Sequence, residues 1–263
     1  MGRSREATLE AELAATTDEL NTLRVEAETA KAREQDLLMR MDEAAAEAER
    51  KAGELEARLI FRESLTATYP RIYFAITGVE VLIPDQRLVE RYKDHKRELE
   101  RHCSGKEAET RYVFHTPGGD SALQGIKAHG MRPSHCPMCR GLAASGDHDM
   151  GWFGCHTKGI YISKHADYTT YYEKDRPPQR DDQGKIVVLE TVTGKIQHFD
   201  RRIDGAMPTA GMHCHESPNH LEFFLWDAST CAEPPGYSYR LVPRFVISWS
   251  AVRARNEIEH DGL

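Results

Sequence analysis

Apolar residues recur at alternating steps of four and three along the first sixty positions of the chain, and charged side chains fill most positions between them. This spacing is typical of the seam of a coiled coil. Polar residues and many alanines weaken the seam, so a solvated single helix held by ion pairs four residues apart is the alternative. We expect residues 1–62 to form a helix that self-associates. The seam positions are Leu9, Leu13, Thr16, Leu20, Leu23, Ala27, Ala30, Glu34, Leu37, Met41, Ala44, Ala48, Lys51, Leu55 and Arg58.

The repeat breaks after Arg62. The dipeptide Tyr69–Pro70 is expected to end the helix, because a residue that precedes proline disfavours the helical conformation. We interpret residues 63–86 as a linker, with a small subdomain as the alternative.

A different pattern begins beyond this linker. Residues 87–103 place Leu88, Tyr92, His95 and Leu99 on one face of a helix whose other positions are mostly charged. Short runs rich in β-branched and aromatic residues follow, each bounded by Gly, Pro or Asp, and they predict strands. The predicted strands cover residues 112–115, 159–162, 186–192, 221–226 and 242–249, and short helices are expected over residues 122–129 and 164–173.

Short strands with few helices between them indicate an α+β domain with a largely antiparallel sheet. We place this domain at residues 87–250 and treat residues 251–263 as a C-terminal tail. The roughly 200 residues after the predicted helix contain almost all of the aromatic, proline and cysteine residues, which is enough for one core of ordinary domain size.

The formal net charge of −7 is concentrated in the predicted helix. Residues 1–62 carry 10 basic and 15 acidic side chains, whereas the remaining residues carry 25 and 27. Such a near-neutral domain attracts nucleic acid only weakly. No apolar run is long enough to cross a bilayer or to act as a secretory signal, so we expect a soluble intracellular protein, cytoplasmic or nuclear. In that reducing environment the six cysteines are interpreted as thiols or metal ligands.

Three segments of the C-terminal part follow one another in an order that is more informative than any one of them alone. In RYVFHTPGGDSALQGIKAHGMRP a strand ends on His115 and a helix leads to Gly130 and Pro133. In KGIYISKHADYTTYY a Gly-x-Tyr strand precedes a helix with a hydroxyl residue and a second Tyr, and in HLEFFLWD a Glu opens an apolar strand. Together with the closing PRFVISW, these segments resemble the catalytic domain of the poly(ADP-ribose) polymerases (PARPs), a branch of the diphtheria-toxin-like ADP-ribosyltransferases.

The resemblance implies an ADP-ribosyltransferase fold with a split sheet, NAD as co-substrate, and a catalytic triad of His115, Tyr161 and Glu222. In the family the triad histidine holds the adenosine ribose of NAD. The triad glutamate hydrogen-bonds a ribose hydroxyl and polarises the acceptor. Because positive charge develops on the ribose as nicotinamide leaves, a carboxylate at this place stabilises the transition state more than the ground state.

Further residues are implied to hold the nicotinamide part of NAD. Tyr161 and Tyr172 would enclose the cationic ring by stacking and cation–π attraction. Thr169 matches the hydroxyl residue that binds the carboxamide, and Gly159 would keep the backbone close to the ring.

The chain departs from the family pattern directly after the triad histidine. The family usually has Gly there, whereas this chain has Thr116 followed by Pro117. Thr offers the same backbone N–H and C=O for the carboxamide, but its Cβ excludes some glycine conformations and the proline restricts it to extended geometry. NAD affinity is therefore open to question at this residue.

The resemblance predicts an enzyme that transfers ADP-ribose from NAD to a protein side chain and releases nicotinamide, with mono-transfer expected over poly-transfer. The alternative is a catalytically inactive PARP-like domain that acts as a coiled-coil scaffold or binding module. An RNA 2′-phosphotransferase on the same fold would need a basic active-site face, which the near-neutral charge of the domain opposes.

A metal site is also predicted. Cys136-Pro-Met-Cys139 has the C-x-x-C spacing of a zinc knuckle, and Cys155 and His156 could complete four ligands of a structural zinc ion. One C-x-x-C is half a site, so two reduced thiols in a loop are the alternative. A redox role is disfavoured because no thioredoxin-like βαβ pattern surrounds the cysteines. Competing ligands are His135, His148 and the run His213, Cys214 and His215.

Overall fold

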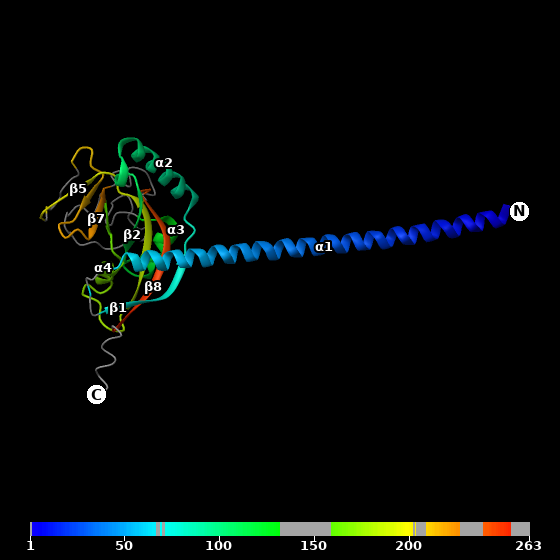
Figure 1. The fold of residues 1–263 in the computed structure, drawn as a ribbon, viewed down its shortest axis with the longest axis horizontal. Helices are drawn as coiled ribbons and strands as arrows, with labels where there is room; N and C mark the ends of the chain where they lie inside the picture. The colour runs from blue at the N-terminus through cyan, green and yellow to red at the C-terminus, as the bar shows by residue number, and fades with distance from the viewer. Residues whose placement is uncertain are drawn as a thin grey trace, which may run out of the picture. The chain divides into compact units, whose positions relative to one another are not determined.

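The computed structural model describes residues 2–66, 69, 72–131, 159–201, 203, 209–226 and 239–253 of the chain. Two compact units are distinguished, Met1–Ala52 and Gly53–Leu263. Helix α1 runs from Gly2 to Glu63 (Figure 1), so the first unit contains most of this helix and its last residues, from Gly53 on, are counted in the second unit. The predicted N-terminal helix is therefore confirmed, and self-association through it stays a prediction.

An eight-stranded sheet forms the second unit (Figure 1). Its order is β1-β8-β4-β2-β3-β7-β6-β5, and every neighbouring pair is antiparallel except the parallel pair β5 and β6. This confirms an α+β fold with a largely antiparallel sheet. The strands are β1 Ile72–Val81, β2 Thr110–His115, β3 Gly159–Ser163, β4 Gln183–Val192, β5 Ile196–His198, β6 Cys214–Glu216, β7 Glu222–Trp226 and β8 Leu241–Arg253.

The sheet is nearly divided in the middle. Strands β2 and β3 are joined through one residue pair, Phe114 and Ser163, whereas β2 pairs with β4 over six residues. A group of four strands, β1, β8, β4 and β2, thus meets a second group, β3, β7, β6 and β5, along a short junction. The split sheet that the sequence led us to expect is located at this junction.

Regular structure extends beyond the predicted domain at both of its ends. Residues 63–86, interpreted as a linker, contain β1, which pairs with β8 over most of its length. Strand β1 is at the edge of the sheet, its side chains are mostly half-buried or exposed, and a register irregularity lies between Ile76 and Gly78. An irregular edge strand lacks the regular apolar alternation that predicts strands. Strand β8 also continues to Arg253, inside the predicted tail.

Helices flank the sheet and have clear start and stop signals. Helix α2, Gln86–His102, begins after Asp85, whose carboxylate accepts hydrogen bonds from the backbone N–H groups of Arg87 and Leu88. Helix α3, Asp120–His129, ends at Gly130, which has a φ of 87°. A Cβ at that position would lie 2.7 Å from Leu88, so both the conformation and the space require glycine. Helix α4, Ala166–Thr169, continues as the 3₁₀ turn η3, Thr170–Glu173, and η1 covers Gly105–Glu107.

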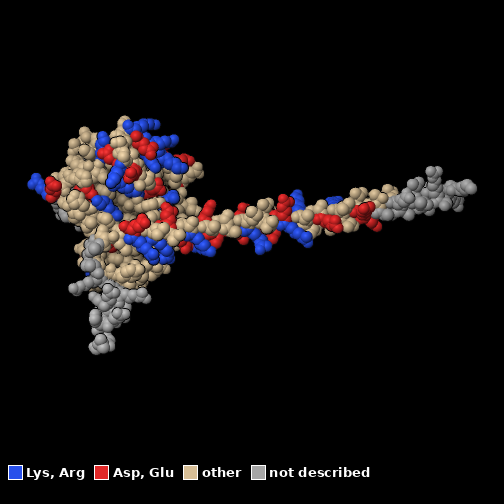
Figure 2. All heavy atoms as spheres, viewed as in Figure 1, with Lys and Arg blue, Asp and Glu red and all other residues tan. Residues whose placement is uncertain are grey.

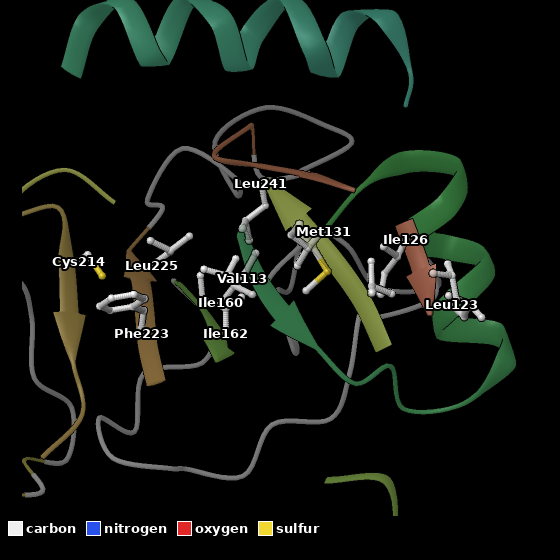
Figure 3. Packing of buried hydrophobic residues seen from close by; sticks show 13 residues of the cluster. Val113, Leu123, Ile126, Met131, Ile160, Ile162, Cys214, Phe223, Leu225 and Leu241 are labelled. Carbon is white, nitrogen blue, oxygen red and sulfur yellow. The ribbon is translucent and has the colours of Figure 1, made fainter. Parts of the chain in front are cut away.

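Two apolar clusters cover the two faces of the sheet. One contains Leu123 and Ile126 of α3 together with side chains of β2, β3, β4 and β7. Figure 3 shows Met131 between Ile126 and the side chains on the central strands. The other contains Phe61 from the end of α1, Ala166 from α4 and Trp249 from β8, all at most 1% exposed. The last turns of α1 therefore belong to the core of the second unit.

Basic and acidic side chains are intermixed on the face of the molecule that Figure 2 shows, both on α1 and on the domain. No large single-sign patch is visible on that face. Among the described residues, no helix combines the length and the apolar character that a membrane span needs.

Candidate functional site

Three adjacent strands carry the residues of the predicted triad. In the register of the sheet, Ser163 of β3 lies opposite both Phe114 of β2 and Glu222 of β7. His115 comes directly after Phe114 and ends β2, and Tyr161 lies two residues before Ser163 on β3. Neighbouring strands are about 4.8 Å apart. The sequence positions of the triad are thus gathered within two residues of the junction between the two halves of the sheet.

A tight turn between β6 and β7 fixes the backbone of Glu222. The hydroxyl oxygen of Ser217 accepts a hydrogen bond of 3.0 Å from the N–H of Glu222, and the N–H of Ser217 donates to the carbonyl of Glu222 at 3.0 Å. Asn219 accepts from the Ser217 hydroxyl at 2.6 Å and from the Leu221 N–H at 3.1 Å. His220 has a φ of 60°, a left-handed conformation that closes the turn. Glu222 is therefore held at a defined place as the first residue of its strand.

Two tyrosine hydroxyls point at the carboxylate of Glu222. Tyr172 donates a hydrogen bond of 2.7 Å to Oε1, and Tyr168 lies 3.5 Å from Oε2. The amide of Asn219 donates to the Tyr168 hydroxyl at 3.3 Å and so orients it. Glu222 is 5% exposed, so the carboxylate is buried among hydrogen-bond donors at the edge of the junction.

Both tyrosines remain donors at any physiological pH. Burial raises the pKa of Tyr172 far above its ordinary value, and the negative charge of Glu222 raises it further. Burial and the Glu222 charge raise the pKa of Tyr168 in the same way. A phenolate beside a buried carboxylate would repel it, so the neutral phenols are the stable partners of an ionised Glu222.

The helical turn that carries these tyrosines is tied to the segment after α1. Asp167 accepts hydrogen bonds from the N–H of Thr66 at 3.1 Å and from its hydroxyl at 2.7 Å. His165 Nδ1 lies 3.1 Å from the carbonyl of Ser64. Residues in the predicted linker thus position α4 and, through it, the partners of Glu222.

Thr116, the departure from the family pattern, is bound to the same helical turn. It is buried, and its hydroxyl donates a hydrogen bond of 2.7 Å to the carbonyl of Thr169. The hydroxyl of Thr169 donates in turn to the carbonyl of Ala166 at 2.9 Å. Because that proton is already used, the Thr169 hydroxyl offers an acceptor rather than a donor to a ligand.

The structure brings the predicted residues together to different degrees. Tyr172 and Glu222 are in direct contact, and Thr116 and Thr169 contact each other. Tyr161 is buried and its ring lies 4.8 Å from that of Phe224. His115 is buried at the end of β2, and Gly159 opens β3. Convergence of these residues on one NAD molecule stays a prediction.

Sequence reasoning missed the residues that orient Glu222, namely Tyr168, Ser217 and Asn219. A signal for Tyr168 was present, because it precedes Tyr172 by four residues and side chains with that spacing share one face of a helical turn. The rings of the two tyrosines do meet edge to face at 6.0 Å. The Ser-Pro-Asn-His run before Glu222 has turn chemistry, but only the fold shows that the turn reaches the carboxylate.

The predicted zinc ligands Cys136, Cys139, Cys155 and His156 lie outside the described residues, as do the competing ligands His135 and His148. The third competing set is described, and within the described residues it does not belong to a group of metal-binding side chains. Cys214 is fully buried in the apolar cluster, and burial raises the pKa of its thiol to about 12. Nδ1 of His213 accepts a hydrogen bond from the backbone N–H of Lys195 at 3.1 Å. A neutral core thiol is a poor metal ligand.

Solved structures provide the comparison that decides the fold. The crystal structure of the TASOR pseudo-PARP domain matches with a TM-score of 0.59, covering 75% of this chain and 93% of that chain at 17% sequence identity. The chain has a PARP-like fold. No family model matches the sequence. No curated protein matches it either. The PARP-like fold therefore rests on structure and on the order of the three sequence segments.

We expect Tyr172→Phe to lower the free energy of unfolding by about 1–2 kcal/mol, because it removes a hydrogen bond to a buried carboxylate. Urea denaturation monitored by tryptophan fluorescence measures this change. Tyr171→Phe is the matched control, since within the described part of the chain the Tyr171 hydroxyl has no hydrogen-bond partner. Equal effects of the two substitutions would mean that the bond to Glu222 contributes nothing.

Proposed function

We propose that this chain is an ADP-ribosyltransferase that uses NAD and modifies a protein side chain, by mono-transfer. The observation that carries the proposal is Glu222, a buried carboxylate held by a tight turn and two tyrosines beside the junction of a PARP-like sheet. Burying a carboxylate costs free energy, and several hydrogen bonds of this fold hold the backbone and the carboxylate of Glu222 in one place. Such an arrangement supports a catalytic group more than a packing residue.

In the proposed reaction the bond between C1′ of the ribose and the nicotinamide nitrogen breaks, and nicotinamide leaves with the electron pair. A nucleophilic side chain of the acceptor protein bonds to the same carbon and loses its proton. Glu222 would stabilise the positive charge that grows on the ribose and accept a hydrogen bond from a ribose hydroxyl. That hydroxyl would take over the place of the Tyr172 phenol at Oε1, which frees the Tyr172 ring to stack on nicotinamide.

The test is incubation of the purified full-length chain with NAD labelled in the adenylate part, with and without a mixture of cellular proteins. We expect label on the chain itself or on added proteins, together with release of nicotinamide in equal amount. Absence of both products would overturn the transferase proposal.

A catalytically inactive domain is the second candidate, and Thr116 favours it. The Cβ and the hydroxyl bond to Thr169 fix the backbone at the position where the family uses glycine to contact the carboxamide. The structural match supports this candidate too, because the TASOR domain is described as a pseudo-PARP domain.

Thr116→Gly separates the two candidates. We expect it to tighten NAD binding roughly tenfold, about 1.4 kcal/mol, because glycine adopts conformations that threonine excludes. Isothermal titration calorimetry with NAD measures the affinity, and Thr116→Ser, which keeps the Cβ and the hydroxyl, should leave it unchanged. If neither the wild-type chain nor the glycine variant binds NAD, the scaffold interpretation replaces the enzyme.

We further propose that helix α1 assembles copies of the chain through the seam predicted from the sequence. Leu23 and Leu37 of that seam are 55% and 58% exposed in one chain, which is costly for apolar side chains unless a second helix covers them. We expect Leu23→Glu with Leu37→Glu to dissociate the assembly in sedimentation velocity experiments. Val25→Glu with Leu38→Glu is the control, because these residues are equally exposed but lie off the seam. A monomeric wild-type chain would refute the proposal.

A further inference from the structure

Three side chains with metal-binding atoms meet at the outer edge of the sheet. They are His198 at the end of β5, Glu216 at the end of β6 and His220 in the turn before β7. One ligand atom from each lies within 4.8 Å of the other two. No other set of His, Cys, Asp or Glu in the described ranges comes together in this way.

The fold, rather than the sequence spacing, assembles this cluster. His198 and Glu216 are register partners in the parallel pair of β5 and β6, so their side chains leave the sheet side by side. His220 follows Glu216 by four residues, and the left-handed conformation of His220 folds the turn back over the end of β6. The rings of His198 and His220 are 6.2 Å apart at 50°, on either side of the same carboxylate oxygen.

The donor atoms are close enough for one ion to contact all three after small shifts of the side chains. Nδ1 of His220 lies 3.2 Å from Oε2 of Glu216, and Nδ1 of His198 is in close contact with the same oxygen. Two ligands that each lie about 2.0 Å from one tetrahedral zinc ion are roughly 3.3 Å apart. Small rotations of exposed imidazole rings suffice to place the metal between the three atoms.

The carboxylate is fixed and the histidines are accessible. The side chain of Glu216 is 6% exposed, and Lys164 forms an ion pair with its other oxygen, Oε1. Lys164 thereby orients the carboxylate and leaves Oε2 to the histidines, which is the role of an outer-shell partner in metal sites. The side chains of His198 and His220 are 60% and 67% exposed, so solvent and an incoming ion reach them directly.

We propose that His198, Glu216 and His220 bind one divalent transition-metal ion of the zinc type, with water as the remaining ligand. Two imidazoles and one carboxylate suit zinc or cobalt rather than magnesium or calcium, which prefer oxygen ligands alone. The lysine ammonium beside the carboxylate opposes a second positive charge, so the ion binds less tightly than in a four-ligand structural site.

The bound ion would join the edge strand β5 to the turn that carries Glu222. His220 is two residues before Glu222, and Glu216 is paired with Phe223 across β6 and β7. β5 is three residues long and is held to the sheet on one side only, so a metal bridge would stabilise both it and the turn. The site does not depend on whether the chain transfers ADP-ribose.

The experiment is a Co²⁺ titration of the chain carrying Cys136→Ser, Cys139→Ser and Cys155→Ser, which removes the predicted cysteine ligands. We expect one Co²⁺ ion to bind with visible absorption and without a thiolate-to-cobalt charge-transfer band. His198→Gln and His220→Gln should each weaken binding at least tenfold, because the amide of Gln is a poor ligand for this ion. Both histidines are exposed, so the variants should fold, and their melting temperatures without metal should equal that of the parent.

His102→Gln is the matched control, since His102 is an exposed histidine at the end of α2, outside the cluster. Its Co²⁺ affinity should equal that of the parent. Zn²⁺ should raise the melting temperature of the parent and of the His102 variant but not of the His198 and His220 variants. The proposal is overturned if this cysteine-to-serine parent binds no Co²⁺, or if the His198 and His220 substitutions change binding no more than the His102 substitution.

Discussion

Glu222→Gln is expected to reduce the rate of the proposed ADP-ribosyl transfer by a factor of roughly 10² to 10³ or more, which is the range for loss of one well-placed electrostatic contact in a transition state. Glutamine keeps the volume of the side chain and one acceptor oxygen, but it replaces the other carboxylate oxygen by a donating NH2 group and removes the charge. The positive charge that develops on the ribose then has no counter-charge. Release of nicotinamide and label transfer from NAD, measured at saturating NAD, give the rate directly.

Two controls separate this chemistry from a loss of structure. The Glu222→Gln variant should bind NAD within a few-fold of wild type, because the charge acts mainly on the transition state. Glu98→Gln, at an exposed position on α2, removes the same charge from the surface and should not change the rate. If transfer survives Glu222→Gln, the site is wrong even though the activity exists.

Phe61→Ala is expected to lower the free energy of unfolding of the domain by about 3–5 kcal/mol, the usual cost of deleting a buried aromatic side chain. Phe61 is 1% exposed and packs in the apolar cluster with Phe74 and Trp249. Chemical denaturation followed by tryptophan fluorescence reports on this cluster. Leu59→Ala on the same helix is the control, because Leu59 is 48% exposed and should cost well under 1 kcal/mol.

Two N-terminally shortened fragments test where the folded domain begins. A fragment that begins at residue 87, as the sequence predicted, lacks both Phe61 and the whole of β1. That fragment should be insoluble or molten, whereas a fragment beginning at residue 53 should fold with the stability of the full chain. Equal stability of the two fragments would show that the end of α1 is not part of the core.

The strands that could be predicted are those with a continuous apolar or alternating pattern. β2, β3, β4, β7 and β8 are central strands with buried side chains, and their runs are readable from the sequence. β5 and β6 are three residues each, too short for any period to show. β1 is an irregular edge strand with few buried positions. Whether such segments form strands depends on their pairing with strands that are distant in sequence, and not on their local residue pattern.

The candidate site was predicted from the order of three segments, which includes a glutamate opening an apolar strand and a tyrosine on a Gly-x-Tyr strand, and its function stays a prediction. The residues that orient Glu222 were not predicted, because Ser217 and Asn219 act through a turn whose direction the fold sets. The cluster of His198, Glu216 and His220 has no sequence motif. His198 is far from the other two in sequence and reaches Glu216 only through the parallel pairing of β5 and β6.

Strands β2 and β3 are joined through a single residue pair, so the two halves of the sheet meet along a narrow junction. Parting a junction of one pair costs about one or two backbone hydrogen bonds, of order 1–3 kcal/mol. Apolar side chains from both halves, such as Val113 and Ile160, belong to one buried cluster that spans this junction (Figure 3). If a ligand binds between Tyr161 and Tyr172 as proposed, it would stabilise the junction of β2 and β3. Amide hydrogen exchange at Phe114 and Ser163 should then be slower with the ligand present than without it.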